Sequence, residues 1–242
     1  MQDAVLVLGA SGSIGGAIAR ELAADGYPLA LHGFTMTSRN KSLGEELSAP
    51  VFAGDLSSPK EVDRLFEDIG KLFDRLAGVV FSVARPFPHK LSHRTKWPVY
   101  QEQLDTQLKA LHLVVEKALP YLRESRNGAR LIILSSEYVR GAPPVKIAPY
   151  VAAKAALTAY AQIIAQELVR HDIRVHILAP GMVRSRLTAD MPDEYLDSLA
   201  EAMPEKRLTS SEDIAKTASF LMRPAADPLY GTVVPVSRAA RR

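Results

Sequence analysis

The chain contains no cysteine among its 242 residues, so disulfide bonds and cysteine-based metal sites are excluded. It also lacks a long apolar run and an N-terminal signal pattern, and we therefore expect a soluble cytoplasmic protein with no membrane role. Its 6 histidines show no ligand spacing with carboxylates, so no metal site is expected. The net charge is only +3, and no basic stripe interleaved with aromatic residues gives support to nucleic-acid binding.

The hydrophobic content of 47% suffices for a sizeable core, and the length suits one α/β domain spanning residues 1–242. Short apolar runs alternate with segments of helical pattern. The expected strands are 4–8, 29–32, 51–53, 78–82, 130–135, 174–179 and 232–236. The expected helices are 17–24, 43–47, 59–73, 99–122, 150–169 and 211–222. This alternation predicts a Rossmann-type, doubly wound sheet of seven mostly parallel strands flanked by helices, with ligands at the carboxyl ends of the strands.

The first expected strand is followed at once by a glycine-rich turn and then by a helical segment. The turn reads Gly9-Ala10-Ser11-Gly12-Ser13-Ile14-Gly15-Gly16. Glycines let the backbone approach a pyrophosphate closely, and the free amides at a helix start attract its charge. The order of strand, turn and helix indicates a dinucleotide-binding site, for which an ordinary tight turn is the alternative.

Tyr150 and Lys154 stand four residues apart in an alanine-rich segment, which favours a helix. On a helix the two side chains share a face, so an ammonium group can lie beside a phenol. A neighbouring cation lowers the pKa of a tyrosine from its ordinary value of about 10 and makes it a better proton donor. Because this spacing also occurs by chance, it gains meaning only beside the other motifs.

In the order and spacing of these features the chain resembles the short-chain dehydrogenase/reductase family over almost its whole length. The shared features are the Gly9-to-Gly15 turn, Asp55-Leu56, Ser136, the Tyr150 and Lys154 pair, and Pro180-Gly181. The length, the 208–215 segment and the 29–32 strand look most like 3-oxoacyl-carrier-protein reductases. The resemblance implies an NAD(P)-dependent oxidoreductase of fatty acid or polyketide-type metabolism, acting on a small or carrier-bound carbonyl compound, with a substrate lid at about 185–207.

The same resemblance implies roles for individual side chains. Tyr150 would give a proton to the substrate carbonyl oxygen while a nicotinamide delivers hydride, and Lys154 would lower the phenol pKa and bind the nicotinamide ribose. Ser136 would hydrogen-bond the same oxygen, unless it is simply the hydroxyl of a strand-end turn. Gln107 aligns with the family's asparagine in a proton path behind the lysine. Ser135 should point to the opposite face of the strand and serve structure.

After the second strand, Gly33 takes the place where NAD enzymes carry a carboxylate for the adenosine ribose. This favours NADP(H) over NAD(H), with Arg39 or Lys41 supplying positive charge, although Arg39 is otherwise a solvated loop residue. Asp55 would lie by the adenine or serve as a turn residue. The residues expected to bind the cofactor are Gly9, Ser11, Gly12, Ser13, Ile14, Gly15, Arg39, Asp55, Leu56, Ser82, Tyr150, Lys154, Pro180, Gly181, Val183 and Ser185.

One segment departs clearly from the family pattern. Where relatives usually read Asn-Asn-Ala-Gly after the fourth strand, this chain has Phe81-Ser82-Val83-Ala84, whose bulk could crowd the adenosine side. Such departures motivate an alternative, a degenerate NADP-binding protein or the partner subunit of an active homologue. The intact Ser136, Tyr150 and Lys154 favour the active enzyme.

The resemblance also implies a homodimer or homotetramer, or a hetero-oligomer with a homologue. Residues of the 99–122 helix that would form the interface, or else face the sheet, are Leu104, Leu108, Leu111 and Val115. Candidate docking charges for an acidic carrier protein, or else solvated surface charges, are Arg126, Arg170 and His171. Residues that would line an apolar substrate pocket, or else pack, are Met182, Leu187, Met191, Tyr195 and Leu199, with 85–90 as another wall.

Overall fold

The computed structural model describes residues 3–238, and its strands follow the predicted positions closely. They are β1 Ala4–Leu8, β2 Leu29–Gly33, β3 Val51–Ala53, β4 Leu76–Phe81, β5 Ala129–Leu134, β6 Ile173–Pro180 and β7 Val233–Val236. They form one 7-stranded sheet in the order β3-β2-β1-β4-β5-β6-β7. Each pairing found among the described residues is parallel, which confirms the predicted doubly wound architecture.

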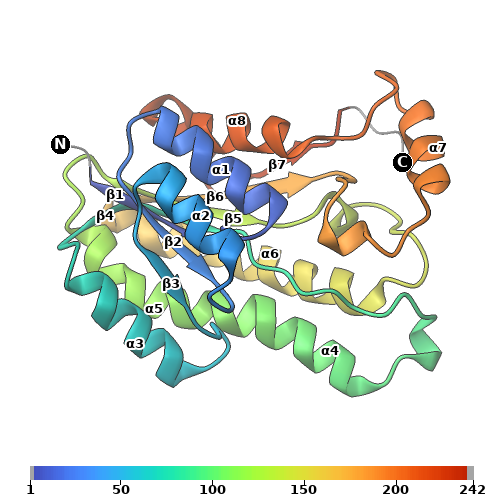
Figure 1. Cartoon of the computed structure of the whole chain (residues 1–242), viewed down its shortest axis with the longest axis horizontal. Coiled ribbons are helices and arrows are strands. Elements are labelled where there is room, and N and C mark those ends of the chain that lie inside the picture. Colours follow the sequence, from blue (N-terminus) through green and yellow to red (C-terminus); the bar gives the residue numbers. More distant parts are fainter. Residues whose placement is uncertain (1–2, 239–242) are drawn as a thin grey trace.

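Helices cover both faces of the sheet (Figure 1). One face carries α1 Ser13–Ala24, α2 Ser38–Leu47 and α8 Ser211–Leu221. The other carries α3 Pro59–Gly70, α5 Ala110–Arg123 and α6 Ala148–Leu168. Two further helices, α4 Trp97–Leu104 and α7 Asp193–Glu201, lie toward one end of the molecule. None of the described helices combines the length and the apolar character needed to cross a bilayer.

Successive side chains of the central strand β1 enter different cores. Leu6 and Leu8 pack in the core under α3, α5 and α6, whereas Val5 and Val7 pack in the core under α1 and α8. All four are fully buried, at 0% exposure. A parallel strand covered on both faces has no solvent side, so it reads as a continuous apolar run. This is the pattern that predicts the strand from the sequence.

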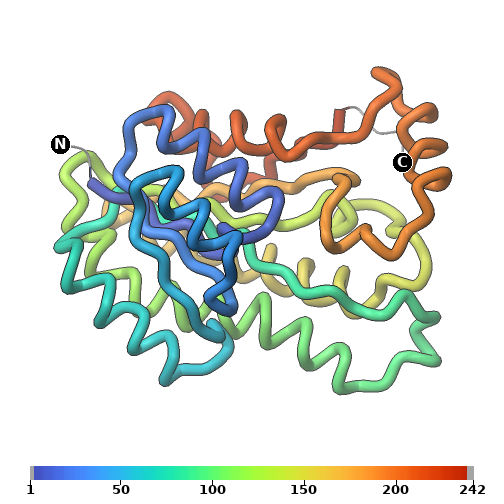
Figure 2. Tube along the Cα trace, in the orientation of Figure 1, coloured from blue at the N-terminus to red at the C-terminus, as the bar shows by residue number. Residues whose placement is uncertain are grey.

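The order of the strands reverses between β1 and β4. Strand β1 pairs with β2 on one side and with β4 on the other, and the chain continues from β1 to α1 on one face of the sheet and from β4 to α5 on the other. In doubly wound sheets a crevice forms at this point and holds the ligand. Figure 2 shows that the segments 83–96, 140–147 and 185–207 gather at the same end of the molecule.

Two glycines allow the backbone to pack tightly beneath this crevice. Gly9 has a φ of 79°, and a Cβ at this position would lie 2.3 Å from the carbonyl oxygen of Ser82. A Cβ on Gly15 would lie 2.3 Å from the carbonyl oxygen of Gly9. Any side chain at either position would collide with backbone, so the turn after β1 requires glycine at both.

We expect Gly9→Ala to lower the free energy of unfolding by more than about 2 kcal/mol, because left-handed backbone alone costs an alanine about 1–2 kcal/mol. The added Cβ would also collide with the Ser82 carbonyl. Gly26→Ala is the matched control, since its φ of 87° is also positive but a Cβ there meets nothing within 4 Å. Urea unfolding of both variants separates backbone strain from collision. Equal losses would contradict the close approach of the two loops.

Candidate active site

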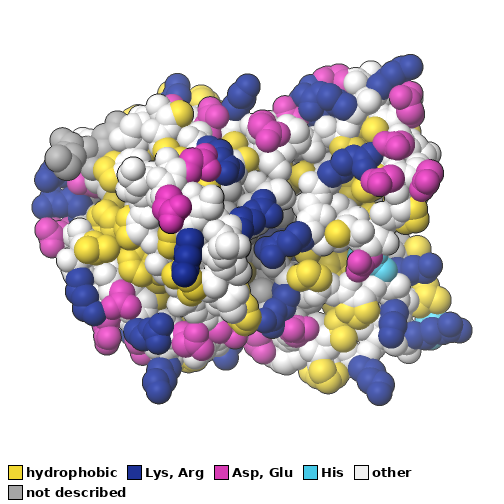
Figure 3. All heavy atoms as spheres, in the orientation of Figure 1, with side chains coloured by type: hydrophobic (Ala, Val, Ile, Leu, Met, Phe, Trp, Pro, Cys, Tyr) yellow, Lys and Arg dark blue, Asp and Glu magenta, His cyan; other side chains and the backbone are white. Residues whose placement is uncertain are grey.

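A cavity of about 440 Å³ opens at the carboxyl ends of the strands. Figure 3 shows basic side chains gathered over a hollow on this face of the molecule. Of the residues expected from the sequence, those that line the cavity are Gly9, Ser11, Gly12, Ser13, Ile14, Gly15, Asp55, Leu56, Ser82, Ser136, Tyr150, Lys154, Pro180, Gly181, Val183 and Ser185. Arg39 and Gln107 are not among the residues that line it. The sequence motifs therefore converge on one cavity.

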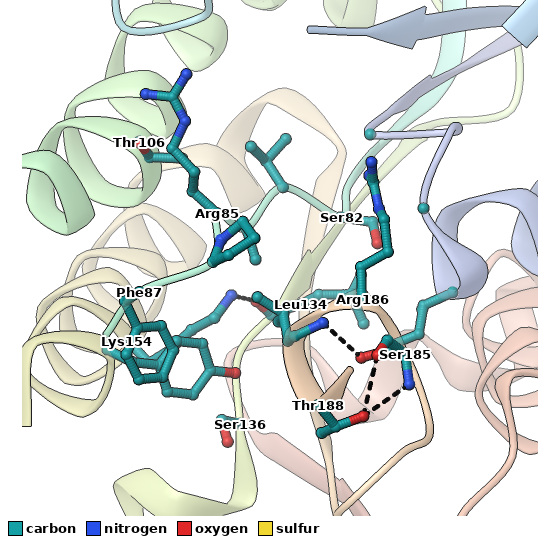
Figure 4. Close-up of a pocket in the computed structure, with 18 of the residues that line it drawn as sticks. Ser82, Arg85, Phe87, Thr106, Leu134, Ser136, Lys154, Ser185, Arg186 and Thr188 are labelled. Atoms are coloured by element: carbon teal, nitrogen blue, oxygen red, sulfur yellow. Dashed lines mark hydrogen bonds between the residues drawn. The ribbon is translucent and has the colours of Figure 1, made fainter. Parts of the chain in front are cut away.

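Tyr150 and Lys154 lie in the first two turns of α6, where Pro149 suits the start of a helix. Both side chains face the cavity. The Lys154 Nζ lies 5.9 Å from the centroid of the Tyr150 ring. It donates a hydrogen bond to the carbonyl oxygen of Leu134 at 2.5 Å (Figure 4). The lysine is thus beside the phenol but is bonded to the end of β5.

Burial controls the ionisation of this pair. It raises the pKa of the Tyr150 phenol, and the hydrogen bond with Ser136 lowers that pKa only in part. Burial also lowers the pKa of Lys154 to about 7. The expected lowering of the tyrosine pKa by the lysine is therefore not found, because Lys154 is held at the Leu134 carbonyl and is itself less readily charged.

The structure shows the turn role considered for Ser136 and also places its side chain in the cavity beside Tyr150. Ser136 follows β5 as the N-cap of a short 3-10 helix, Glu137–Val139, and its hydroxyl accepts from the Tyr138 amide at 3.3 Å. The same side chain, only 4% exposed, hydrogen-bonds with Tyr150. The preceding Ser135 lies with its Oγ 2.5 Å from the Thr158 Oγ1, which agrees with a structural role.

The helix expected over 99–122 is interrupted near its middle. A π-helical turn, Asp105–Lys109, separates α4 from α5, and such turns often occur at functional sites. Gln107 lies in this turn, fully buried, and its Nε2 donates to Gln103 at 3.0 Å. Gln103 in turn donates to the Arg85 carbonyl oxygen at 3.2 Å. Because Gln107 does not line the cavity, these bonds make it a support for the segment after β4 rather than a residue in contact with a ligand.

Asn40 decides the shape of the chain after β2. Its side-chain Nδ2 donates to the Thr35 carbonyl oxygen at 2.7 Å. Its backbone amide donates to the side-chain hydroxyl of Thr37, the N-cap of α2. The same Nδ2 would lie 2.2 Å from a Cβ on Gly33. Because Asn40 takes the buried side of the first turn of α2, the neighbouring Arg39 is exposed to solvent and away from the cavity. The structure does not bring Arg39 to the expected cofactor site.

The sequence motifs pointed neither to Phe34 nor to the positive charge of Arg85, although both residues line the cavity. Phe34 directly follows β2 and is 51% exposed. The guanidinium of Arg85 lies 4.5 Å from the centroid of the Phe34 ring and forms an ion pair with Glu102 at 2.9 Å. Arg85 follows directly after the divergent 81–84 segment, and this adjacency is the signal that could have identified it.

The charges around the cavity are mostly positive. The basic side chains that line it are Arg85, Lys146, Lys154 and Arg186. Asp55 is the only carboxylate among the described residues around it. Its Oδ1 already accepts from the amide and hydroxyl of Ser57, at 2.9 and 2.7 Å, so Asp55 acts as a turn residue. This balance favours an anionic ligand.

The expected crowding by Phe81 does not occur. Its side chain is fully buried in the core under α3, α5 and α6, because side chains alternate between the faces of β4. Within the same segment, Val83 and Ala84 both line the cavity, where the family pattern has the smaller alanine and glycine.

The 85–90 segment forms a wall of the cavity, as expected. The Phe87 ring stacks on Tyr150 with centroids 5.2 Å apart and an angle of 13° between the planes. The His89 ring, whose centroid lies 5.1 Å from that of Phe87, also lines the cavity. The expected apolar residues that also line the cavity are Met182, Leu187, Met191 and Tyr195, whereas Leu199 does not.

The expected docking charges lie at the wrong end of the sheet. Arg126, Arg170 and His171 follow α5 and α6 and precede β5 and β6, so they lie at the amino ends of the strands. The cavity lies at the carboxyl ends, because each helix carries the chain back across the sheet. Among the expected interface residues, Leu111 and Val115 belong to the core and face the sheet.

The lowered pKa of Lys154 predicts how stability changes with pH. The pKa of this ammonium rises from about 7 in the folded protein to its usual 10.5 on unfolding, so between these values the unfolded chain binds more protons. Stability therefore rises with pH in this window. Lys154→Met removes this contribution, so the free energy of unfolding of the variant minus that of the parent should fall as the pH rises.

Urea unfolding between pH 7 and 10, without added nucleotide, measures this difference. Lys216→Met is the control, because Lys216 is exposed on α8. A difference for Lys154→Met that stays constant with pH would show that the buried lysine keeps its ordinary pKa.

A family model described as enoyl-(acyl carrier protein) reductase matches residues 9–238. The 3-oxoacyl-[acyl-carrier-protein] reductase FabG of Staphylococcus epidermidis is 28% identical, over 98% of this chain and 98% of its own. That of Staphylococcus aureus is 29% identical, over 98% and 97%. Among solved structures, the Pseudomonas aeruginosa RhlG/NADP active-site complex is 26% identical with a TM-score of 0.91, covering 98% of this chain and 95% of that one. This chain belongs to the short-chain dehydrogenase/reductase family and is an NAD(P)-dependent oxidoreductase.

Proposed function

We propose that the protein is an NADPH-dependent reductase that converts a ketone, a 3-oxoacyl group or a similar carbonyl, to a secondary alcohol. One observation carries this proposal. A single cavity brings Ser136, Tyr150 and Lys154 together with the glycine turn after β1. A proton donor, a second hydroxyl and a phosphate-binding backbone thus face the same space.

The residues present fit a nicotinamide dinucleotide. Helix α1 begins at Ser13, and Gly12 provides no side-chain cap for its first amides. Such amides bind phosphate oxygens, and the glycines allow the close approach. The basic lining of the cavity adds favourable charge. When bound, the dinucleotide supplies the hydride that adds to the carbonyl carbon.

Tyr150 donates the proton that the carbonyl oxygen takes up in the same reaction. Its raised pKa keeps the phenol protonated near neutral pH, which is the form that can donate. Ser136 donates a hydrogen bond to the same oxygen and stabilises the charge that develops on it. Lys154, with a pKa of about 7, can exchange a proton at neutral pH and so restore the phenol after each turnover.

The substrate end of the cavity favours an apolar chain beside the carbonyl. Phe87, Met182, Leu187 and Met191 provide this surface. The hydroxyls of Ser136 and Tyr150, which line the same cavity, suit an oxygen that gains negative charge, and this supports a carbonyl over a carbon–carbon double bond. The names of the Staphylococcus relatives support a 3-oxoacyl compound as the first substrate to test.

A non-catalytic NADP-binding subunit is the second candidate, and one observation favours it. The Phe87 ring covers one face of the Tyr150 ring and narrows the approach to the phenol. The two functions differ in whether Tyr150 is needed for turnover.

Tyr150→Phe should lower kcat/KM for NADPH-dependent reduction of a 3-oxoacyl thioester by about 10²–10⁴-fold, the range expected when a general acid is removed. NADPH binding should remain, because the ring is kept. Tyr160→Phe is the matched control on the same helix, where the hydroxyl lies 3.1 Å from His112 and outside the cavity. Equal rates of NADPH oxidation in the parent and Tyr150→Phe would favour the non-catalytic subunit.

The preference for NADPH is proposed to depend on Arg85 rather than on Arg39. Strand β2 ends at Gly33 and is followed by Phe34, so no carboxylate stands at this point to repel a 2′-phosphate. The guanidinium of Arg85 lies over the Phe34 ring at the same end of the cavity. An arginine near a ribose phosphate binds it through charge-assisted hydrogen bonds.

Arg85→Ala should therefore raise the KM for NADPH by about tenfold and leave the KM for NADH little changed, as expected when one charged hydrogen bond is lost. Arg39→Ala is the matched control, because Arg39 is exposed outside the cavity. Steady-state rates measured with NADPH and with NADH give the change in each KM. A larger effect at Arg39 than at Arg85 would contradict this assignment.

A further inference from the structure

Arg186 lies in a turn at the edge of the cavity that is held by hydrogen bonds between neighbouring residues. It begins the 3-10 helix Arg186–Thr188, just after Ser185. The Ser185 hydroxyl accepts from the Leu187 amide at 3.2 Å, and the Ser185 amide donates to the Thr188 hydroxyl at 2.9 Å. Figure 4 shows these bonds on one side of the turn, while the Arg186 side chain extends from it toward the part of the cavity where Ser82 lies.

The two arginines that flank Ser185 are bonded differently. Arg184 donates to Asp193 at 2.8 Å and to Asp197 at 2.5 Å, and so fastens the 185–207 segment to its own helix α7. For Arg186, no carboxylate or other hydrogen-bond partner is found within residues 3–238. One arginine therefore stabilises the segment, and the other faces the cavity without a protein anion.

Two other basic groups at the cofactor side of the cavity have partners in the protein. Arg85 pairs with Glu102 and lies over the Phe34 ring, where the 2′-phosphate is proposed to bind, and Lys154 donates to the Leu134 carbonyl. Opposite the 185–207 segment lies the glycine turn, where the first amides of α1 have no side-chain cap. A guanidinium that faces such amides can bind the same phosphate group from the other side, through its planar pair of donors.

We propose that Arg186 binds the pyrophosphate of the nicotinamide dinucleotide and thereby closes the 185–207 segment over the cofactor. This inference rests on the proposed function and deepens it, since it makes the cofactor the ligand that closes the lid. Met182, Leu187 and Met191 belong to or adjoin the same segment and line the substrate end of the cavity. Closure on the cofactor therefore completes the substrate pocket, and the cofactor binds first.

Arg186→Ala should raise the Kd of NADPH about tenfold, as expected for the loss of a charge-assisted hydrogen bond. The Kd of NADH should rise by the same factor, because both dinucleotides contain the pyrophosphate. Arg186→Lys keeps the charge but not the planar fork, so its Kd should lie between those of the parent and the alanine variant. Lys216→Ala, which removes one positive charge from the exposed face of α8, should bind both dinucleotides like the parent. Fluorescence titration of the full chain measures all four proteins.

A second measurement tests the closure itself. In the parent, saturating NADPH should slow hydrogen exchange of the backbone amides of 185–207. In Arg186→Ala, also saturated with NADPH, these amides should exchange as they do without nucleotide. A purely structural role of Arg186 would instead change their exchange before any nucleotide is added, and this result would overturn the proposal.

The remaining outcomes distinguish the sources of the anion. A loss of affinity limited to NADPH would place Arg186 at the 2′-phosphate and overturn the inference. Unchanged dinucleotide affinity, with a raised KM for acetoacetate but not for a neutral ketone, would place it at a substrate carboxylate and also overturn it. If the parent binds neither dinucleotide, the proposed function itself fails. If the parent binds both and Arg186→Ala equals the parent, only the role of Arg186 fails.

Discussion

The close approach of the loops that leave β1 and β4 is the constraint on which the rest of the site depends. The space between Gly9 and the Ser82 carbonyl is too small for a single additional carbon atom. This contact fixes the direction of the glycine turn on one side of the crevice. On the other side it fixes where the 83–96 segment begins, and hence where Arg85 and Phe87 can reach. The cavity is therefore a property of the strand order as much as of the side chains that line it.

Burial has opposite effects on the two ionisable groups at the centre of the cavity. It keeps the phenol of Tyr150 protonated and makes the ammonium of Lys154 easy to deprotonate, because a low-dielectric surrounding disfavours either charge. A simple picture of a lysine that lowers the pKa of a tyrosine omits this desolvation. With a pKa of about 7, the lysine is only partly charged at neutral pH. The bond to the Leu134 carbonyl also ties its position to the end of β5.

The sequence was sufficient for the architecture and for the residues that belong to contiguous motifs. Parallel strands buried on both faces show continuous apolar runs, and the glycine turn and Tyr150 with Lys154 are local patterns. Prediction failed where the role of a residue depends on the direction in which its side chain points from its helix or strand. Arg39 and Asn40 are neighbours, yet Asn40 takes the buried side of α2, and Phe81 turns into the core.

Contacts between segments that lie far apart in the chain also could not be predicted from the sequence. The position of Arg85 over Phe34 joins residues after β4 and β2, and no local pattern encodes it. The docking charges were misplaced because Arg126 and Arg170 follow helices that had already returned to the amino ends of the strands.

Lastly, the packing of Asn40 against Gly33 restricts how this chain could evolve. A carboxylate at position 33, the simplest route to a preference for NAD, would have to displace an amide that also holds the entry to α2. An acidic residue at position 33 thus requires at least two coordinated substitutions, which makes it hard to reach by single mutations.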